Sequence, residues 1–193
     1  QVFAGILVGV GTVALKYMKI DDNVDSFMDE ADIARKCDHP NIIQTIGVCF
    51  DPPSIITESS LSPVDCLKVA KHVCSQFVSM LQTKFYKISF GMIYLESVGI
   101  VHLDLAARNI LIGKTIDTIK YITLCIISSF SIQITDFGLS RRLENKNYYS
   151  TVKNNFPVSW TAPEGIVLGN AVVPSKKGKL DHKSDVWSFG VVL

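Results

Sequence analysis

One arrangement of polar residues constrains this chain more than any other, because it requires distant parts of the sequence to meet. Asp104 and Asn109 lie five residues apart between apolar runs, and Asp136 opens an Asp-Phe-Gly turn after a β-branched segment. On one loop, the Asp can accept a proton while the Asn oxygen ligates Mg²⁺. Asp136 offers a second carboxylate for the same metal. The fold therefore has to bring the loop and the turn together.

Size and charge limit the class of protein. The 193 residues, 48% of them hydrophobic, suit one domain with a substantial core or two small lobes around a cleft. A formal net charge of +1 gives no reason to expect nucleic acid or an anionic membrane surface as the main partner. We expect no membrane span, because the most apolar stretch, residues 119–134, contains Lys120 and several Ser and Thr side chains.

The five cysteines show neither paired metal-ligand spacing nor a disulfide framework. Scattered free thiols are typical of a reducing compartment. We therefore expect a cytoplasmic protein, placed at the intracellular face of the membrane if the chain comes from a receptor. The membrane span of such a receptor would lie outside this chain.

Periodicity divides the chain into a sheet-rich part and a helical part, with the boundary near Glu58. Apolar and β-branched runs between Gly or Pro turns indicate short strands, and apolar residues at helical spacing indicate helices. The predicted strands cover residues 2–3, 12–19, 46–50, 55–57, 110–112, 118–123 and 132–135, and the predicted helices cover residues 26–37, 64–73, 76–97 and 184–193.

Several motifs follow one another in a fixed order along the chain. They are Val-Ala-Leu-Lys at 13–16, Glu30 in the next helix, His-Leu-Asp-Leu-Ala-Ala-Arg-Asn at 102–109, Asp-Phe-Gly at 136–138, Ala-Pro-Glu at 162–164 and Ser-Asp-Val-Trp-Ser-Phe-Gly at 184–190. Each motif alone is an ordinary turn, strand end or capped helix. Together and in this order they resemble the protein-kinase signature.

Two details make the chain similar to tyrosine kinases in particular. The loop reads Leu-Ala-Ala-Arg-Asn after Asp104, where serine/threonine kinases usually carry a Lys two residues after the Asp. Residues 156–164 resemble the platform that tyrosine kinases offer to the substrate residue. The resemblance covers nearly the whole chain and implies an α+β, two-lobe protein-kinase-like fold, truncated at both ends. It further implies transfer of the ATP γ-phosphoryl group to tyrosine in protein substrates.

Within this resemblance, residues 1–57 correspond to the small lobe, with an antiparallel sheet and one helix, and residues 58–193 to the mostly helical large lobe. The resemblance gives the polar residues of the motifs three roles. Asp104 is the proton acceptor, supported by Arg108. Lys16 and Glu30 position the phosphates, and Asn109 and Asp136 bind Mg²⁺. Asp185 resembles the buried Asp that anchors the backbone of the catalytic loop.

The resemblance also assigns positions around the adenine base and on the activation loop. Thr57 matches the gatekeeper at the back of the adenine pocket, and Glu58 and Ser60 match hinge positions whose backbone groups bond the base. Tyr148 and Tyr149 match activation-loop tyrosines, although exposed loop residues of no special role would look the same. Three apolar positions match those that sandwich adenine, namely Val2, Ala14 and Leu111. Ordinary core packing explains apolar residues at these positions equally well.

Two substitutions depart from the family pattern. Leu103 stands where the family usually has the Arg that binds the phosphorylated activation-loop tyrosine, so we expect coupling to loop phosphorylation to be lost. Ala34 lies one helical turn after Glu30, where a larger apolar residue usually stacks against Phe137. A smaller side chain there is expected to weaken the active arrangement.

Other parts of the family pattern are not in this sequence. The glycine-rich loop is missing except for the trailing Gln1 and Val2, and the chain stops at Leu193 within the central helix of the large lobe. Glu164 therefore lacks its usual Arg partner, and a buried carboxylate without a cation is costly. One alternative stays open, namely a catalytically inactive kinase-like binding module or an unproductive fragment. The presence of all core catalytic side chains argues for an enzyme instead.

Residues 121–133 interrupt the strand that leads into Asp136. Without them, Lys120 would join Ile134 in an ordinary alternation of apolar and polar residues. The segment reads YITLCIISSFSIQ and has no turn chemistry, so we interpret it as an insertion from a retained intron or a gene-model error. A genuine hairpin of this family member is the alternative.

Overall fold

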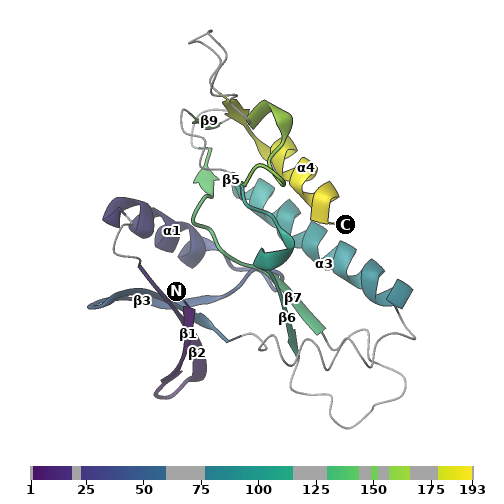
Figure 1. Cartoon of the computed structure of the whole chain (residues 1–193). Helices are drawn as coiled ribbons and strands as arrows, with labels where there is room; N and C mark the ends of the chain where they lie inside the picture. The colour runs from purple at the N-terminus through teal and green to yellow at the C-terminus, as the bar shows by residue number, and fades with distance from the viewer. Residues whose placement is uncertain are drawn as a thin grey trace.

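The computed structural model describes residues 2–18, 23–59, 77–114, 130–143, 149–151, 157–165 and 178–192. An antiparallel sheet in the order β1-β2-β4-β3 packs against helix α1, and helices α3 and α4 lie apart from it (Figure 1). The predicted α+β, two-lobe fold is therefore confirmed. The bounds are Val2–Leu7 for β1, Gly11–Tyr17 for β2, Val24–Lys36 for α1, Thr45–Phe50 for β3, Pro53–Glu58 for β4, Phe77–Ser97 for α3 and His182–Val192 for α4.

Short antiparallel pairs and turns complete the described part of the chain. Ile100–Val101 (β5) pairs with Arg141–Arg142 (β8), Ile110–Lys114 (β6) with Phe130–Ile134 (β7), and Tyr149–Thr151 (β9) with Gly178–Leu180 (β10). Two 3-10 turns cover Ala107–Asn109 (η1) and Pro163–Gly165 (η4). The predicted strand at 118–123 and the predicted helix at 64–73 lie outside the described residues.

Local sequence explains the small lobe. Gly9 and Gly11 adopt positive φ angles of 84° and 112°, which L side chains rarely reach, and they close the hairpin between β1 and β2. The side chain of Asn23 accepts a hydrogen bond from the N–H of Asp25 at 2.8 Å and so caps α1. Phe27 of that helix is buried in an apolar cluster that includes Ile55 of β4, which fastens the helix to the sheet.

The main core joins the two lobes. Ala34 and Cys37 at the end of α1 share it with Leu95 of α3 and with Phe137. The loop after α1 crosses to the large lobe, because the N–H of Ile134 donates to the carbonyl of Asn41 at 2.8 Å. Gly91 of α3 permits this approach, since a Cβ there would lie 3.1 Å from the same carbonyl oxygen and 2.8 Å from a methyl group of Ile134.

The insertion predicted at residues 121–133 needs correction at its end. Residues 130–133 belong to β7, which pairs with β6 from Ile110↔Ile134 to Lys114↔Phe130. Ile132 is 2% exposed, and the side-chain amide of Gln133 donates to the carboxylate of Glu58. The alternation of polar and apolar residues that leads into Asp136 therefore begins with Phe130, because the pairing with β6 selects that register. Residues 121–129 lie outside the described residues.

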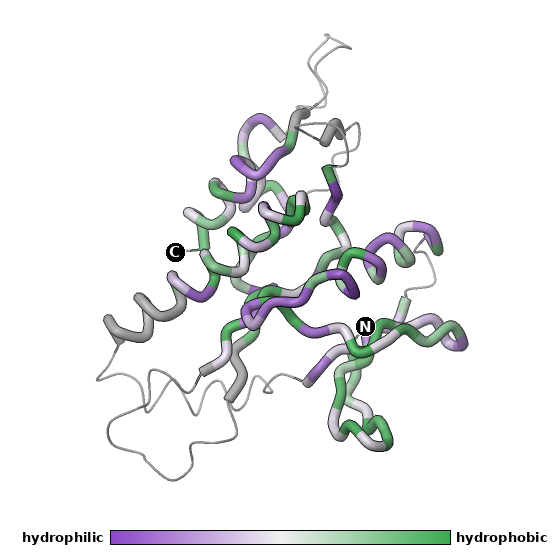
Figure 2. The backbone as a smooth tube through the Cα atoms, turned by 180° about the vertical axis from the view of Figure 1, so that it is seen from behind, coloured by the Kyte–Doolittle hydropathy of each residue, from purple (hydrophilic) through white to green (hydrophobic). Residues whose placement is uncertain are grey.

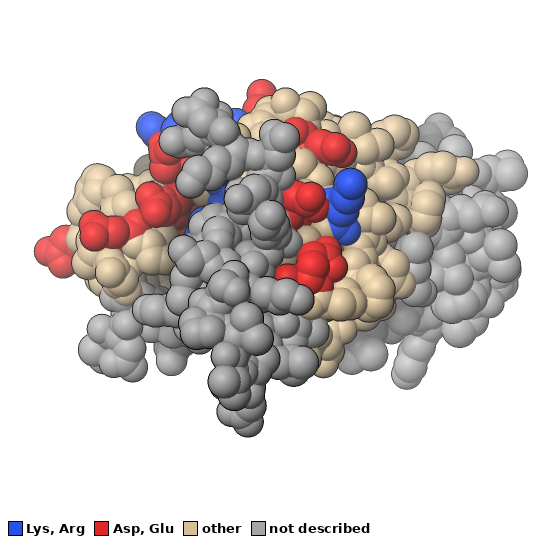
Figure 3. Space-filling view, turned by 90° about the horizontal axis from the view of Figure 1, so that it is seen from above, with Lys and Arg blue, Asp and Glu red and all other residues tan. Residues whose placement is uncertain are grey.

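The surface of the described residues carries both apolar and charged side chains. The β1–β2 hairpin is hydrophobic along much of its length (Figure 2). Within it, Ile6 and Val8 are 85% and 96% exposed. On the face shown in Figure 3, acidic and basic side chains are interspersed among the described residues. No described helix combines the length and the apolar character that crossing a bilayer requires.

The buried hydroxyl of Thr45 is expected to lower the stability of the folded chain. Thr45 is 7% exposed, and its hydroxyl is the one buried side-chain N or O atom among the described residues that has no hydrogen-bond partner. Thr45→Val keeps the shape but removes the unsatisfied group, so we expect the free energy of unfolding to rise by about 1–2 kcal/mol. Urea denaturation measures the change, with the exposed residue Thr12 changed to Val as the control. A loss of stability in Thr45→Val alone would show that the hydroxyl does find a partner.

Candidate active site

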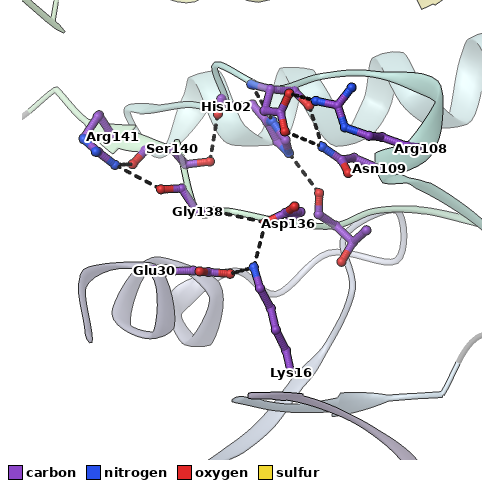
Figure 4. Close-up of polar contacts among 11 residues, drawn as sticks. Lys16, Glu30, His102, Arg108, Asn109, Asp136, Gly138, Ser140 and Arg141 are labelled. Atoms are coloured by element: carbon purple, nitrogen blue, oxygen red, sulfur yellow. Dashed lines mark hydrogen bonds and ion pairs between the residues drawn. The ribbon is translucent and has the colours of Figure 1, made fainter. Parts of the chain in front are cut away.

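Lys16 of β2, Glu30 of α1 and Asp136 after β7 meet at one point. The Lys16 Nζ atom lies 2.5 Å from Glu30 Oε1 and 2.7 Å from Asp136 Oδ1 (Figure 4). The sheet register explains the geometry, because Lys16 is paired with Ile55, whose buried side chain belongs to the cluster with α1. The structure thus brings both predicted phosphate-positioning residues next to a predicted metal-binding carboxylate.

Mutual charge sets the protonation of this group. Burial lowers the pKa of Lys16, but the carboxylates of Glu30 and Asp136 outweigh burial and leave that pKa raised. Burial by itself would raise the pKa of Asp136. The Lys16 ammonium opposes this effect through its charge and its hydrogen bond, and the pKa of Asp136 ends below its ordinary value. Lys16 and Asp136 are therefore both charged at neutral pH, as a site for anionic phosphates and a divalent cation requires.

Glycine and an unusual backbone angle shape the turn at Asp136. Its φ angle is +67°, in the left-handed region. The N–H of Gly138 donates to Asp136 Oδ1 at 3.4 Å, and a Cβ at Gly138 would lie 3.3 Å from that oxygen and 3.4 Å from Glu30 Oε2. A side chain at residue 138 would thus crowd the carboxylates that flank Lys16.

A second cluster forms on the loop before β6. Arg108 forms an ion pair with Asp104 through Nη2 and Oδ1. The amide nitrogen of Asn109 donates to the Asp104 carbonyl and to Asp104 Oδ2, each at 2.8 Å. Because both acceptors are oxygens, the amide nitrogen must face them, and the amide oxygen of Asn109 is turned away from Asp104. That oxygen and the Asp136 carboxylate are the hard donors that Mg²⁺ prefers, so the residues fit the metal.

The loop is held by a buried carboxylate, as the sequence predicts. Asp185 of α4 accepts the N–H of His102 at 2.7 Å and the N–H of Leu103 at 2.9 Å. Leu103 has a φ angle of +65°, an unfavourable conformation for a leucine. The two hydrogen bonds from the backbone to Asp185 therefore stabilise a bend that the local sequence does not favour.

His102 links the loop to the turn at Asp136. Its ring is fully buried, and burial lowers its pKa, so the imidazole is neutral. Nδ1 accepts the N–H of Asp104 at 3.2 Å, which leaves the proton on Nε2 to be donated to the carbonyl of Thr135, also at 3.2 Å. The ring also lies 5.3 Å from that of Phe137. These contacts bring the two polar clusters into one site.

Comparison with known proteins agrees with this geometry. The family model described as "Protein tyrosine and serine/threonine kinase" matches residues 1–193. The chain belongs to this kinase family. It is 34% identical over 197 residues to tyrosine protein-kinase src-1 of Caenorhabditis elegans, with 100% of the chain and 33% of that protein covered.

Two other relatives show the same pattern. The kinase chain is 37% identical over 187 residues to tyrosine-protein kinase Abl of Drosophila melanogaster, covering 94% of the chain and 10% of that protein. It is 34% identical over 198 residues to tyrosine-protein kinase SRK3 of Spongilla lacustris, covering 100% of the chain and 52% of that protein. The chain thus spans between a tenth and about half of the length of the relatives named here.

The positions assigned to adenine binding lie on four strands of the kinase. Ala14 on β2 is paired with Thr57 on β4, so both side chains are on the same face of the sheet as Lys16. Glu58 accepts the N–H of Gln44 at 3.1 Å through its carboxylate, a contact that sequence reasoning missed. Ser60 lies outside the described residues. Of the two remaining positions, Val2 lies in β1 and is 65% exposed, and Leu111 lies in β6 and is half-buried.

The departures from the kinase pattern have structural counterparts. Leu103 is 6% exposed in an apolar cluster with Val101 and Leu180, and Leu139 and Leu143 pack against it. The backbone of Tyr149, in β9, is paired with that of Leu180 in β10. Apolar packing thus occupies the place where the family usually has an arginine. The Tyr149 side chain and all of Tyr148 lie outside what the structure describes.

Glu164 differs from its sequence-based description. We expected a buried carboxylate without a cation, but the residue is exposed in the described structure. It accepts a hydrogen bond from the Ser184 hydroxyl at 3.1 Å. Within the described residues, the Glu164 carboxylate is thus neither buried nor without a hydrogen-bond donor.

Asp185 is expected to make the stability of this kinase chain depend on pH. Burial raises the pKa of its carboxyl from the ordinary 3.8 to about 7, although the backbone donors His102 and Leu103 oppose the rise. Between these pH values the folded chain binds more protons than the unfolded chain, so the free energy of unfolding falls as pH rises. The slope from this group is at most about 1.4 kcal/mol per pH unit.

Chemical denaturation at several pH values between about 4.5 and 6.5 measures that slope. Asp185→Asn cannot ionise, so its free energy of unfolding should fall less with rising pH than that of the unmodified chain. The exposed residue Asp29 of α1, changed to Asn, is the matched control for the substitution itself. Parallel curves for Asp185→Asn and the unmodified chain would contradict the raised pKa.

Proposed function

We propose that the chain transfers the γ-phosphoryl group of ATP to tyrosine in protein substrates. One observation carries the proposal. The charged group of Lys16, Glu30 and Asp136 adjoins a loop on which Arg108 and Asn109 hold the carboxylate of Asp104. Phosphoryl transfer needs little covalent chemistry from the protein and depends mainly on positioning and on neutralising charge. The two clusters supply both.

The residues divide the work as follows. Lys16, oriented by Glu30, positions the phosphates of ATP, and Asn109 and Asp136 hold Mg²⁺. When bound, Mg²⁺ neutralises the negative charge that phosphoryl transfer develops on the phosphate oxygens. Asp104 accepts the proton of the substrate hydroxyl. Its ion pair with Arg108 keeps the carboxylate in place for that proton transfer.

The substrate class rests on Arg108 and on the relatives. The Ala-Ala-Arg stretch places the arginine where it contacts the catalytic carboxylate, which matches the tyrosine-kinase form of this loop. The relatives named above are tyrosine-protein kinases. We also propose a cytoplasmic location, at the inner face of the membrane if the chain comes from a receptor. The free thiols of Cys37 and Cys49 support this location.

Phosphoamino-acid analysis tests the substrate class. The full-length protein, given ATP, Mg²⁺ and a mixed pool of peptides, should yield phosphotyrosine at least about tenfold in excess of phosphoserine and phosphothreonine together. Asp104→Asn is the control and should abolish the signal. Mainly phosphoserine would contradict the proposal. Binding of ATP without any transfer would favour the alternative of a catalytically inactive binding module.

A further inference from the structure

Trp160 belongs to the stretch that resembles the substrate platform, and its ring also contacts the loop that carries Asp104 and Arg108. The central carbon of the Arg108 guanidinium lies 5.0 Å from the centroid of the Trp160 ring. The same guanidinium forms the ion pair with Asp104. Arg108 is therefore shared between an aromatic face and the carboxylate that accepts the substrate proton.

The position of Trp160 is itself determined by its surroundings. The backbone N–H of Trp160 donates to the carbonyl of Pro157 at 3.0 Å, and the backbone carbonyl of Trp160 accepts a hydrogen bond from the Ser188 hydroxyl at 2.7 Å. Ser188 belongs to α4 and is 4% exposed. The backbone of Trp160 is thus hydrogen-bonded to α4. The same helix supplies Asp185, which accepts the backbone N–H of His102 in the catalytic loop.

Arg108 needs such a restraint. Its side chain is 47% exposed, and a long, half-exposed side chain has many accessible rotamers. The carboxylate binds an edge of the planar guanidinium through Nη2, whereas an aromatic ring attracts its cationic face. Two contacts of different direction fix the plane of the guanidinium, which neither contact achieves alone.

We infer that Trp160 is a positioning residue for tyrosine phosphorylation, because its ring holds the Arg108 guanidinium against Asp104. This inference rests on the proposed function. The ring acts on the side of the site where the substrate hydroxyl gives up its proton. Lys16, Glu30 and Asp136 form a separate cluster, so loss of the ring should affect turnover of the peptide and spare the binding of ATP.

Kinetics of the full-length protein test the inference with three variants. Trp160→Leu removes the aromatic face, Trp160→Phe keeps one, and Trp187→Phe changes the other tryptophan, which is half-exposed on α4. We expect Trp160→Leu to lower kcat for a tyrosine peptide by about 5- to 30-fold with little change in KM for ATP. Trp160→Phe should recover most of kcat, and Trp187→Phe should stay within about twofold of the unmodified protein.

Either of two kinetic results for Trp160→Leu would overturn the inference. One is an unchanged kcat in Trp160→Leu. The other is a loss of kcat that is matched by an equal rise in KM for ATP, because that result indicates general disorder of the site. Failure of Trp160→Phe to improve on Trp160→Leu would equally exclude the aromatic face as the cause.

Fluorescence tests the contact without any catalysis. This chain has two tryptophans, so each Arg108 variant is compared with its own Trp187→Phe background, and the change in emission reports on Trp160. Adding Arg108→Leu should shift that emission and increase its quenching by acrylamide, whereas Arg108→Lys, which keeps a cation, should change both less. Identical spectra with and without Arg108 would refute the contact. If the unmodified protein phosphorylates no peptide, the proposed function fails, while this measurement still decides whether Trp160 holds Arg108.

Discussion

Replacing Lys16 with Met is expected to reduce tyrosine phosphorylation at least about 100-fold. The Lys16 ammonium lies within 2.7 Å of both Glu30 and Asp136, and its charge is what would orient the phosphates of ATP. Methionine has a similar length but no charge, so the substitution leaves the carboxylates and removes the cation between them. The initial rate of peptide phosphorylation measures the effect.

The fold should survive this change, because Lys16 lies at the edge of the core and its side chain is 33% exposed. Circular dichroism of Lys16→Met should therefore stay close to that of the unmodified chain, although its thermal unfolding should occur at a lower temperature, because the Glu30 carboxylate, 11% exposed, loses its cation. Arg35→Met is the matched control, since Arg35 is an exposed cation on the same helix as Glu30. Equal activity of Lys16→Met and the unmodified protein would refute the phosphate-positioning role. Equal loss in Arg35→Met would show that charge in general, and not this position, matters.

Replacing Leu103 with Arg is expected to destabilise the folded chain by about 2–5 kcal/mol while the activation loop is unphosphorylated. Leu103 is 6% exposed among Val101 and Leu180, so the substitution removes apolar contacts and places a charge in an apolar cluster. Chemical denaturation measures the loss. Leu143→Arg, at the half-buried edge of the same cluster, should cost less and serves as the control.

Phosphorylation at Tyr149 should have different effects on turnover in the unmodified protein and in Leu103→Arg. With Leu103 in place, Tyr149→Phe is expected to change turnover only slightly, because leucine cannot bind a phosphate. In Leu103→Arg, phosphate at Tyr149 would gain a charge-assisted partner, and turnover should rise about tenfold over the dephosphorylated form. Initial rates of both versions, with and without phosphate, measure this. Strong activation by phosphate while Leu103 remains would mean that another cation binds it.

Short-range signals account for what could be predicted of the fold. The glycines at 9 and 11 mark the turn between β1 and β2, and the 26–37 periodicity matches α1 to within two residues at its start and one at its end. The strand before Asp136 shows where such signals fail. Its apolar alternation extends back to Phe130, but residues 121–133 as a whole are rich in apolar and β-branched residues without turn chemistry, and only the pairing with β6 selects the strand among them. Strand pairing depends on a partner that is distant in sequence.

The sequence by itself was enough to predict the motifs proposed to be catalytic, because each is a short run whose spacing already places its side chains on one loop or one strand. Asp104, Arg108 and Asn109 are an example, since η1 brings them together locally. Only the tertiary structure decided which of these runs meet and what surrounds them. It placed Lys16 against Asp136, 120 residues away, and left the Thr45 hydroxyl unpaired. It also set Trp160 against Arg108. These are contacts through space between elements, and local propensity carries no information about them.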